Sequence, residues 1–217
     1  NMRITFPLIA ITLGLAAPAG AQCWDQHLVA GVTDTRLSSG LALGDGVIAF
    51  GQPRFDPTLS PLVEDVVRVF ELGAGGYAEV ASFTSSLPGH TAASFGLELD
   101  LDGAWLAVGD PQAGASTTAA SGAVHLFRRT IGGWLLQQVL QPAVVPEPFL
   151  FGFGAALDLE GDTLVVGAPQ AASSLATFED GVVFVFRRTG NTWNEVQRIA
   201  HPQPAFGAGF GFGVDLD

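Results

Sequence analysis

The sequence predicts an all-β fold built from consecutive four-stranded antiparallel units. One phrase recurs at residues 37–53, 95–111 and 153–169 and begins again at residue 210, so its spacing is 58, 58 and 57 residues. Self-similarity at such a spacing is typical of repeat proteins in which each copy is one supersecondary unit. Abundant glycine (28 residues) and short alternating apolar runs favour strands, and no sustained helical periodicity is found.

Each repeat contains four short segments bounded by Gly, Pro, Asp or Ser, which is the pattern of strands. We expect strands near residues 40–43, 47–51, 65–70 and 77–83; 95–101, 104–109, 122–127 and 134–140; and 153–159, 163–167, 181–186 and 193–200. Four antiparallel strands form one blade of a β-propeller. Residues 24–29 resemble a fourth strand that lacks the three preceding ones, so we expect them to close the last blade of a ring.

Aromatic residues and glycines recur at fixed places in the repeats. An aromatic ends each third strand and begins each fourth strand: Phe70, Phe127 and Phe186, then Tyr77, Trp134 and Trp193. A large aromatic at a fixed place in every copy predicts packing between neighbouring blades. A glycine follows each second strand, at Gly51, Gly109 and Gly167, where we expect a turn or a close approach of backbone.

The segments between second and third strands are the longest and least alike. They span residues 54–64, 112–121 and 170–180, and the Pro-rich segments 142–150 and 202–209 link fourth strands to first strands. Both kinds of connection emerge on the same face of a propeller. Loops on a rigid scaffold usually carry recognition, so we expect a ligand on that face.

The charge balance excludes some partners. The formal net charge is −12 and all nine basic residues are arginines, so nucleic acid and anionic membranes are poor partners for the whole domain. The pairs Arg128-Arg129 and Arg187-Arg188 occupy the same place in two repeats, and we interpret them as solvated strand ends.

Residues 1–21 have the pattern of a secretory signal peptide. Met2-Arg3 is followed by an apolar run and by the small residues Ala19-Gly20-Ala21, which predicts cleavage after Ala21. A lipoprotein acylated at Cys23, the single cysteine, is the alternative, which Gln22 before the cysteine disfavours. No later apolar run is long enough to serve as a transmembrane anchor. The mature chain is therefore expected to be secreted, periplasmic or at the cell surface.

The FG…GAP phrase and the aromatic-led fourth strand resemble the FG-GAP repeat family, which is similar to the N-terminal β-propeller of integrin alpha chains. The third copy matches the pattern well, the second has Asp110 in place of the Ala of GAP, and the first keeps Gly51 and Pro53. The resemblance implies a propeller, commonly of about seven blades. Accordingly we expect three blades of a partial ring, truncated at its C-terminus and completed by further repeats. The expected divisions are residues 22–36 for the closing segment, 37–94, 95–152 and 153–209 for repeats 1 to 3, and 210–217 for the start of repeat 4.

The resemblance also implies a calcium loop between first and second strands. The corresponding residues are Asp100, Asp102, Asp158, Glu160 and Asp162. A calcium ion takes six to eight oxygen ligands, and each segment offers only two or three carboxylates beside a glycine. We therefore favour tight type I′ turns at Asp102-Gly103 and Glu160-Gly161, with no cofactor, and keep calcium as the alternative.

The residues of known catalytic motifs are missing from the sequence: no G-x-S-x-G, P-loop or H-E-x-x-H occurs. We therefore expect an exported, non-catalytic interaction or adhesion protein whose partner is an extracellular protein or glycan. The alternative is the propeller of a secreted polysaccharide lyase or hydrolase, with catalytic residues outside this sequence.

Overall fold

Twelve strands form three four-stranded antiparallel sheets in the computed structural model, which describes residues 40–52, 65–87, 94–114, 122–142, 152–172 and 180–217. Sheet 1 contains β1 (Leu41–Gly44), β2 (Val47–Gln52), β3 (Val66–Gly73) and β4 (Gly76–Phe83). Sheet 2 contains β5 (Leu99–Asp102), β6 (Trp105–Asp110), β7 (Ala123–Thr130) and β8 (Gly133–Leu140). Sheet 3 contains β9 (Ala156–Glu160), β10 (Thr163–Ala168), β11 (Val182–Thr189) and β12 (Thr192–Ala200). The expected all-β, blade-like architecture is confirmed.

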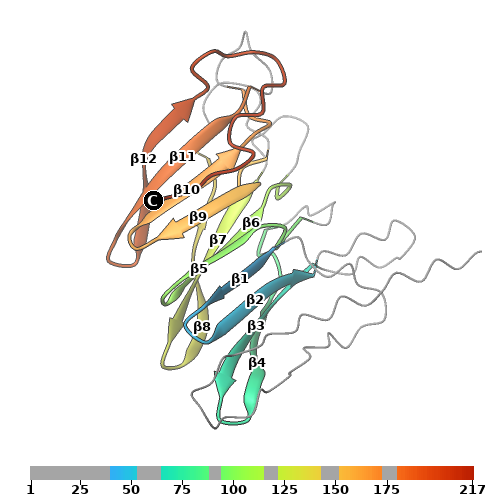
Figure 1. Cartoon of the computed structure of the whole chain (residues 1–217), viewed down its shortest axis with the longest axis vertical. Helices are drawn as coiled ribbons and strands as arrows, with labels where there is room; N and C mark the ends of the chain where they lie inside the picture. Colours follow the sequence, from blue (N-terminus) through green and yellow to red (C-terminus); the bar gives the residue numbers. More distant parts are fainter. Residues whose placement is uncertain (1–39, 53–64, 88–93, 115–121, 143–151, 173–179) are drawn as a thin grey trace, which may run out of the picture.

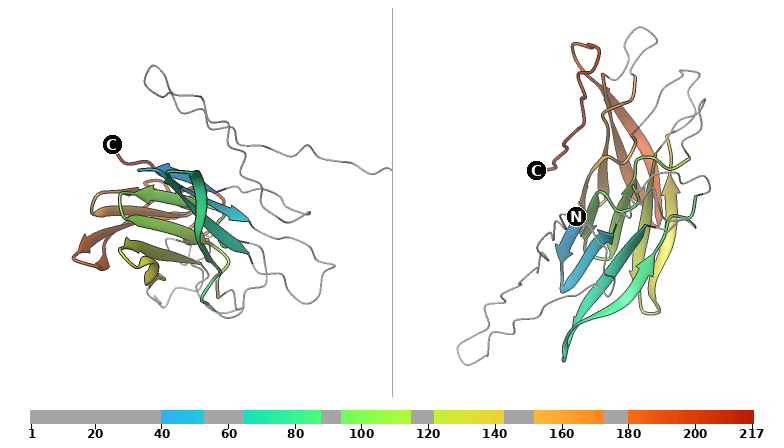
Figure 2. Two further views of the ribbon diagram at one scale, coloured as in Figure 1. Left: turned by 90° about the horizontal axis from the view of Figure 1, so that it is seen from below. Right: turned by 90° about the vertical axis from the view of Figure 1, so that its right-hand side faces the viewer.

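The strands of each sheet are ordered in space as they are in the sequence. The first strands contact one another, β1 with β5 and β5 with β9, whereas contact between the fourth strands β4 and β8 is sparse. Figures 1 and 2 show the three sheets following one another with these first strands side by side. The sheets are therefore packed most closely along the first strands.

The two ends of every sheet differ in their connections. First to second strands and third to fourth strands are joined by two-residue turns, such as residues 103–104 between β5 and β6 and residues 131–132 between β7 and β8. The connections at the other end are long, as between β6, which ends at Asp110, and β7, which begins at Ala123. All the long connections leave one end because successive strands are antiparallel.

Strand bounds differ from the prediction by more than one residue at two places. The FG pairs at Phe95 and Phe153 precede the first strands instead of lying in them, since β5 begins at Leu99 and β9 at Ala156. The glycines of these pairs have left-handed backbone, with φ of 81° at Gly96 and 93° at Gly154, which ends strand geometry there. The third strands also run three residues beyond the predicted Phe70, Phe127 and Phe186.

Close glycine contacts explain the FG and GAP elements of the repeated phrase. A Cβ on Gly51 would lie 2.0 Å from the backbone oxygen of Gly96, and a Cβ on Gly109 would lie 2.2 Å from that of Gly154. The same relationship joins Gly167 to Gly211, at 2.0 Å. The GAP glycine of one sheet thus packs against the FG glycine of the next copy, which confirms the predicted close approach.

The predicted aromatic residues of sheets 2 and 3 pack between sheets, whereas Phe70 of sheet 1 stacks on Phe50 of the same sheet, with ring centroids 5.5 Å apart. Phe127 and Trp134 belong to the core between sheets 1 and 2, and Phe186 and Trp193 to the core between sheets 2 and 3. The rings of Trp105 and Trp193 meet edge to face with centroids 5.6 Å apart. Each such ring buries on the order of 150–250 Å², so these positions contribute strongly to sheet packing.

The first-to-second turns correct the predicted turn type. The central residues in sheet 2 are Gly103 and Ala104, and only Gly103 has a positive φ, 54°. In sheet 3 they are Gly161 and Asp162, of which only Gly161 (φ 56°) is positive. A type I′ turn needs two positive φ values, so these are not type I′ turns; a positive φ at the first central residue alone is the sign pattern of type II′.

The turn in sheet 1 does have the type I′ sign pattern. Asp45 and Gly46 join β1 to β2 with φ of 48° and 74°. The type I′ sign pattern thus occurs in the first repeat and not in the second and third repeats, where the sequence predicts it.

Several predictions concern residues outside the described ranges. They are the signal peptide 1–21, the closing segment 22–36 and most of the long connections. Residues 210–217 are described and place Phe210 and Gly211 against sheet 3. No helix with the length and apolar character needed to cross a bilayer occurs in the described residues.

Candidate functional site

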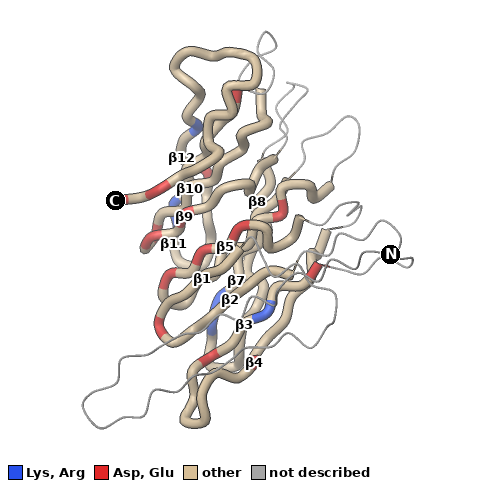
Figure 3. The backbone as a smooth tube through the Cα atoms, turned by 45° about the vertical axis from the view of Figure 1, so that its right-hand side comes forward, with Lys and Arg blue, Asp and Glu red and all other residues tan. Residues whose placement is uncertain are grey.

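The five residues of the predicted calcium loops lie on two adjacent first strands and one turn. Asp100 and Asp102 are on β5, Asp158 and Glu160 on β9, and Asp162 is in the turn that follows β9. Acidic positions follow these first strands, whereas basic positions lie mainly on the third strands (Figure 3). The structure thus gathers the carboxylates where sheets 2 and 3 meet.

The aspartates bond to the backbone of the next copy of the repeat. Asp100 Oδ2 accepts a hydrogen bond of 2.5 Å from the N–H of Leu159, and Asp102 Oδ2 accepts one of 2.7 Å from the N–H of Gly161. Asp158 accepts the equivalent bond from the N–H of Leu216. Each first-strand aspartate therefore joins its own sheet to the residue that follows the corresponding acidic residue of the next copy.

Sheet 1 lacks this aspartate, because the equivalent position is Ala42. The N–H of Leu101, which would otherwise bond to sheet 1, donates instead to Asp100 Oδ1 at 2.8 Å. Asp100 consequently accepts one backbone N–H with each of its oxygens. Both of its oxygens are committed to structural hydrogen bonds.

Two carboxyl groups here are shifted toward their protonated forms. Burial raises the pKa of Asp100, with smaller increases from a hydrogen bond to Asp158 and from the charge of Asp158, while the N–H groups of Leu159 and Leu101 oppose the rise. Burial also raises the pKa of Glu98, followed by the charge of Asp100. A hydrogen bond between the Asp100 and Asp158 carboxyl groups needs a proton on one of them, so protonation favours this contact.

The five residues do not converge on one point that would suit a metal ion. Asp162 forms an ion pair with Arg188, and Glu160 is exposed at the end of β9. Within the described residues, no group of three or more His, Cys, Asp or Glu side chains has the arrangement needed to hold a metal. What the structure brings together is Asp100 with Asp158, close enough for Asp158 to contribute to the raised pKa of Asp100.

Asp110 has a role that sequence reasoning missed. It occupies the Ala position of the GAP element, is fully buried and accepts hydrogen bonds of 2.7 Å from the hydroxyls of Ser94 and Ser85. Asp65 similarly accepts from the N–H of Ser94 at 2.8 Å. These aspartates stabilise the residues that enter sheet 2. The sequence does contain an indication of this role, because Asp110 replaces the alanine of the repeated GAP element.

The paired arginines are not simply solvated strand ends. Arg187 is exposed, but Arg128, Arg129 and Arg188 are half-buried. The guanidinium of Arg188 lies over the Trp105 ring, 5.3 Å from its centroid. The prediction is therefore wrong for three of the four arginines, because the aliphatic and planar parts of arginine pack well on aromatic rings.

No family model and no curated protein matches the chain.

Proposed function

We propose that this chain forms blades of an exported, non-catalytic β-propeller that acts as a protein- or glycan-interaction module. The observation that carries the proposal is the difference in length between the connections at the two ends of each sheet. Short two-residue turns close one end, and every long connection leaves the other. Long segments held on rigid sheets are the usual place for recognition.

The propeller part of the proposal is supported by the repeated relationship between sheets. The glycine contact between Gly51 and Gly96 recurs between Gly109 and Gly154, and the sheets meet mainly along their first strands. A relationship that repeats from unit to unit generates a ring when its rotation closes on the first copy, as it does in β-propellers. Further copies would supply the blades that complete it.

The non-catalytic part rests on how the first-strand carboxylates are used. Asp100, Asp102 and Asp158 each accept a backbone hydrogen bond from the following copy. Groups engaged in this way hold sheets together and are poorly placed to exchange protons with a substrate. We therefore assign them a structural role.

One observation favours the enzyme alternative, a polysaccharide lyase or hydrolase. Glu98 is half-buried beside Asp100, and burial followed by the charge of Asp100 raises its pKa. A carboxyl group with a raised pKa beside a second carboxylate is the arrangement used for general acid catalysis. Turnover of a polysaccharide that is lost in Glu98→Gln would establish this alternative.

The test is a binding screen of the intact protein on arrays of glycans and of extracellular proteins. Positive partners are then measured with two variants, one in which residues 112–121 are replaced by a short Gly-Ser segment and one in which residues 131–132 are lengthened by the same kind of segment. We expect the first variant to lose binding and the second to keep it. Equal loss in both, or product release from any polysaccharide, would contradict an interaction module that uses the long connections.

A further inference from the structure

A glutamate joins sheets 1 and 2 at the end that carries the two-residue turns. Glu71 Oε1 accepts a hydrogen bond of 2.8 Å from the indole Nε1–H of Trp134. Glu71 Oε2 accepts one of 2.6 Å from Nη2 of Arg129. One carboxylate from β3 thus satisfies an indole and a guanidinium of sheet 2.

The equivalent place between sheets 2 and 3 has the same donors, but the carboxylate found there, Asp162, pairs with Arg188. Among the described residues, no carboxylate bonds to the indole of Trp193. Trp193 and Arg188 correspond to Trp134 and Arg129, each at the same place on its third or fourth strand. The position of Glu71, directly after the phenylalanine of the third strand, is occupied in sheet 2 by Arg128. The acceptor Glu71, between sheets 1 and 2, is therefore replaced by the donor Arg128 between sheets 2 and 3.

Three buried N–H groups at this place have no acceptor among the described residues: Trp193 Nε1, Arg128 Nε and Arg188 Nε. Of these, Trp193 Nε1 is the counterpart of the Trp134 N–H that donates to Glu71. The Trp193 side chain is the most deeply placed of these, since the residue is only 2% exposed. Unpaired buried donors of this kind are rare in proteins and call for an explanation.

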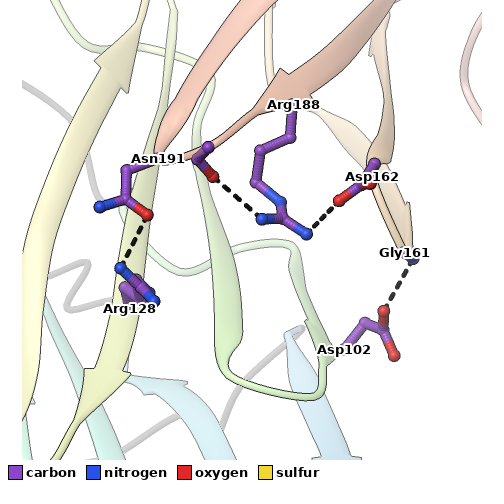
Figure 4. Close-up of polar contacts among 7 residues, drawn as sticks. Asp102, Arg128, Gly161, Asp162, Arg188 and Asn191 are labelled. Carbon is purple, nitrogen blue, oxygen red and sulfur yellow. Dashed lines mark hydrogen bonds and ion pairs between the residues drawn. The ribbon is translucent and has the colours of Figure 1, made fainter.

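The two arginines at this place have different partners. Figure 4 shows Arg188 paired with Asp162, whereas Arg128 donates to the neutral side chain of Asn191, at 2.7 Å. Both guanidinium groups lie over Trp105, at 5.8 Å for Arg128 and 5.3 Å for Arg188. The nearby carboxylate of Asp102 accepts from the backbone N–H of Gly161, so among these contacts Arg128 is the arginine whose partner is uncharged.

We propose that Trp193, Arg128 and Arg188 form a binding site for a carboxylate, supplied by an acidic side chain of a partner polypeptide. The occupant of the equivalent interface, Glu71, is such a side chain and bonds to the same two kinds of donor. A polyuronate is disfavoured because the acidic chain repels an evenly charged polyanion. The site lies at the two-residue-turn end, so it is separate from the proposed recognition by the long connections.

An entering carboxylate meets the arginines first. Arg128 and Arg188 are half-buried, and within the described residues their side chains donate to Asn191, Asp162 and Gly190. One carboxylate oxygen then bonds to a guanidinium and the other to the indole N–H, in the way that Glu71 bonds to Arg129 and Trp134. Arg128 and Arg188 attract the ligand, and Trp193 fixes its orientation.

The test follows the tryptophan indole N–H resonances of the ¹⁵N-labelled protein while the peptide Gly-Glu-Gly, blocked at both ends, is added. The Trp193 resonance is identified as the one that Arg128→Glu displaces, and the Trp134 resonance as the one that Glu71→Gln displaces. We expect a saturable shift of the Trp193 resonance only, because the Trp134 N–H is already bonded. The uncharged peptide Gly-Gln-Gly is expected to cause no shift.

The decisive variant is Arg128→Glu, which restores the arrangement of the first interface. We expect it to abolish the peptide-dependent shift and to raise Tm by about 2–4 °C. Arg187→Glu makes the same charge change at an exposed neighbour and is expected to keep the shift. If Arg128→Glu is poorly folded, Arg128→Met removes the donor without adding a charge, and it too is expected to weaken the shift.

Three outcomes would overturn the proposal. One is an unchanged Trp193 resonance at saturating Gly-Glu-Gly. Another is a shift that Arg128→Glu or Arg128→Met leaves intact. The third is a shift produced by glucuronate but not by the peptide, which would assign the site to acidic glycans instead of polypeptides.

Discussion

The carboxylate of Asp100, in the second sheet, accepts a hydrogen bond of 2.5 Å from the backbone N–H of Leu159, in the third. The two residues are 59 positions apart, and Asp158 and Leu216 repeat the relationship one copy later. A side chain that resembles a metal ligand in the sequence thus serves as an acceptor between sheets. Removing the Asp100 carboxylate should therefore weaken the contact between sheets 2 and 3.

Asp100→Ala is expected to destabilise the protein by about 1–3 kcal/mol, because it leaves the N–H groups of Leu101 and Leu159 without their acceptor. Urea unfolding measures the difference. Glu160→Ala is the control, since Glu160 is exposed at the end of β9. Equal stability of the two variants would refute a structural role for Asp100.

The stability of the protein is expected to depend on pH through Glu98. Burial raises the folded-state pKa of Glu98 above the ordinary 4.5, followed by the charge of Asp100, so folding favours the protonated form. This stabilisation is fully present below the unfolded pKa and is lost as the pH rises through the higher folded pKa. Ionised Glu98 therefore disfavours the folded state at neutral pH.

Glu98→Gln is accordingly expected to raise Tm at pH 7 but to change it little at pH 4. The gain is expected to be below about 1 kcal/mol, since Glu98 is in partial contact with solvent. Thermal unfolding monitored by circular dichroism at both pH values measures it, with Glu160→Gln as the control. A gain of the same size at pH 4 would show that relief of ionisation is not the cause.

Gly109→Ala is expected to destabilise the protein by about 1–3 kcal/mol or more, because the new Cβ would lie 2.2 Å from the backbone oxygen of Gly154. Neither backbone segment is free to move away without separating sheets 2 and 3. The matched control is Gly75→Ala, where a Cβ meets nothing within 4 Å. Denaturant unfolding of both variants tests the prediction, and similar midpoints would contradict it.

Glu71→Ala is expected to cost about 1–3 kcal/mol, because the buried indole N–H of Trp134 and Nη2 of Arg129 would lose a shared acceptor. Glu79→Ala is the control. Glu79 forms an exposed ion pair with Arg68, which is worth about 1 kcal/mol at most. Urea unfolding measures both variants. A larger loss of stability in Glu79→Ala than in Glu71→Ala would contradict an important role for the part-buried contacts of Glu71.

Calcium is expected to leave the protein unchanged. Asp100, Asp102 and Asp158 accept backbone hydrogen bonds, and Asp162 is paired with Arg188. Isothermal titration with Ca²⁺ should give no saturable heat, and Tm should not move. A saturable heat together with a rise in Tm would restore the calcium interpretation of these residues.

Much of the fold could be predicted from the repeated phrase, because its features are local. Alternation marks the strands, and the glycines near residues 45, 103 and 161 mark the hairpin turns. The turn type was less predictable. A shift of one residue in the pairing changes which residues are central, and register depends on the neighbouring strand.

The residues that join the sheets were harder to predict. Asp110 and Glu71 each bond to residues of another sheet or of another strand connection, from 16 to 63 positions away. A pattern of neighbouring residues in the sequence cannot indicate hydrogen-bond partners at such distances along the chain. Their unusual positions in the repeat, Asp110 for the Ala of GAP and Glu71 for an arginine, were the available signals.

The sequence by itself determined the repeat period, the four strands of each unit and the aromatic positions that pack between sheets, because each follows from alternation and spacing along one chain. The tertiary structure decided what the charged residues do. Asp100 meets Leu159, and Trp193 lacks the carboxylate that Trp134 has, only because two sheets are placed side by side. Whether a polar group is satisfied depends on neighbours distant in sequence, and packing alone determines those neighbours.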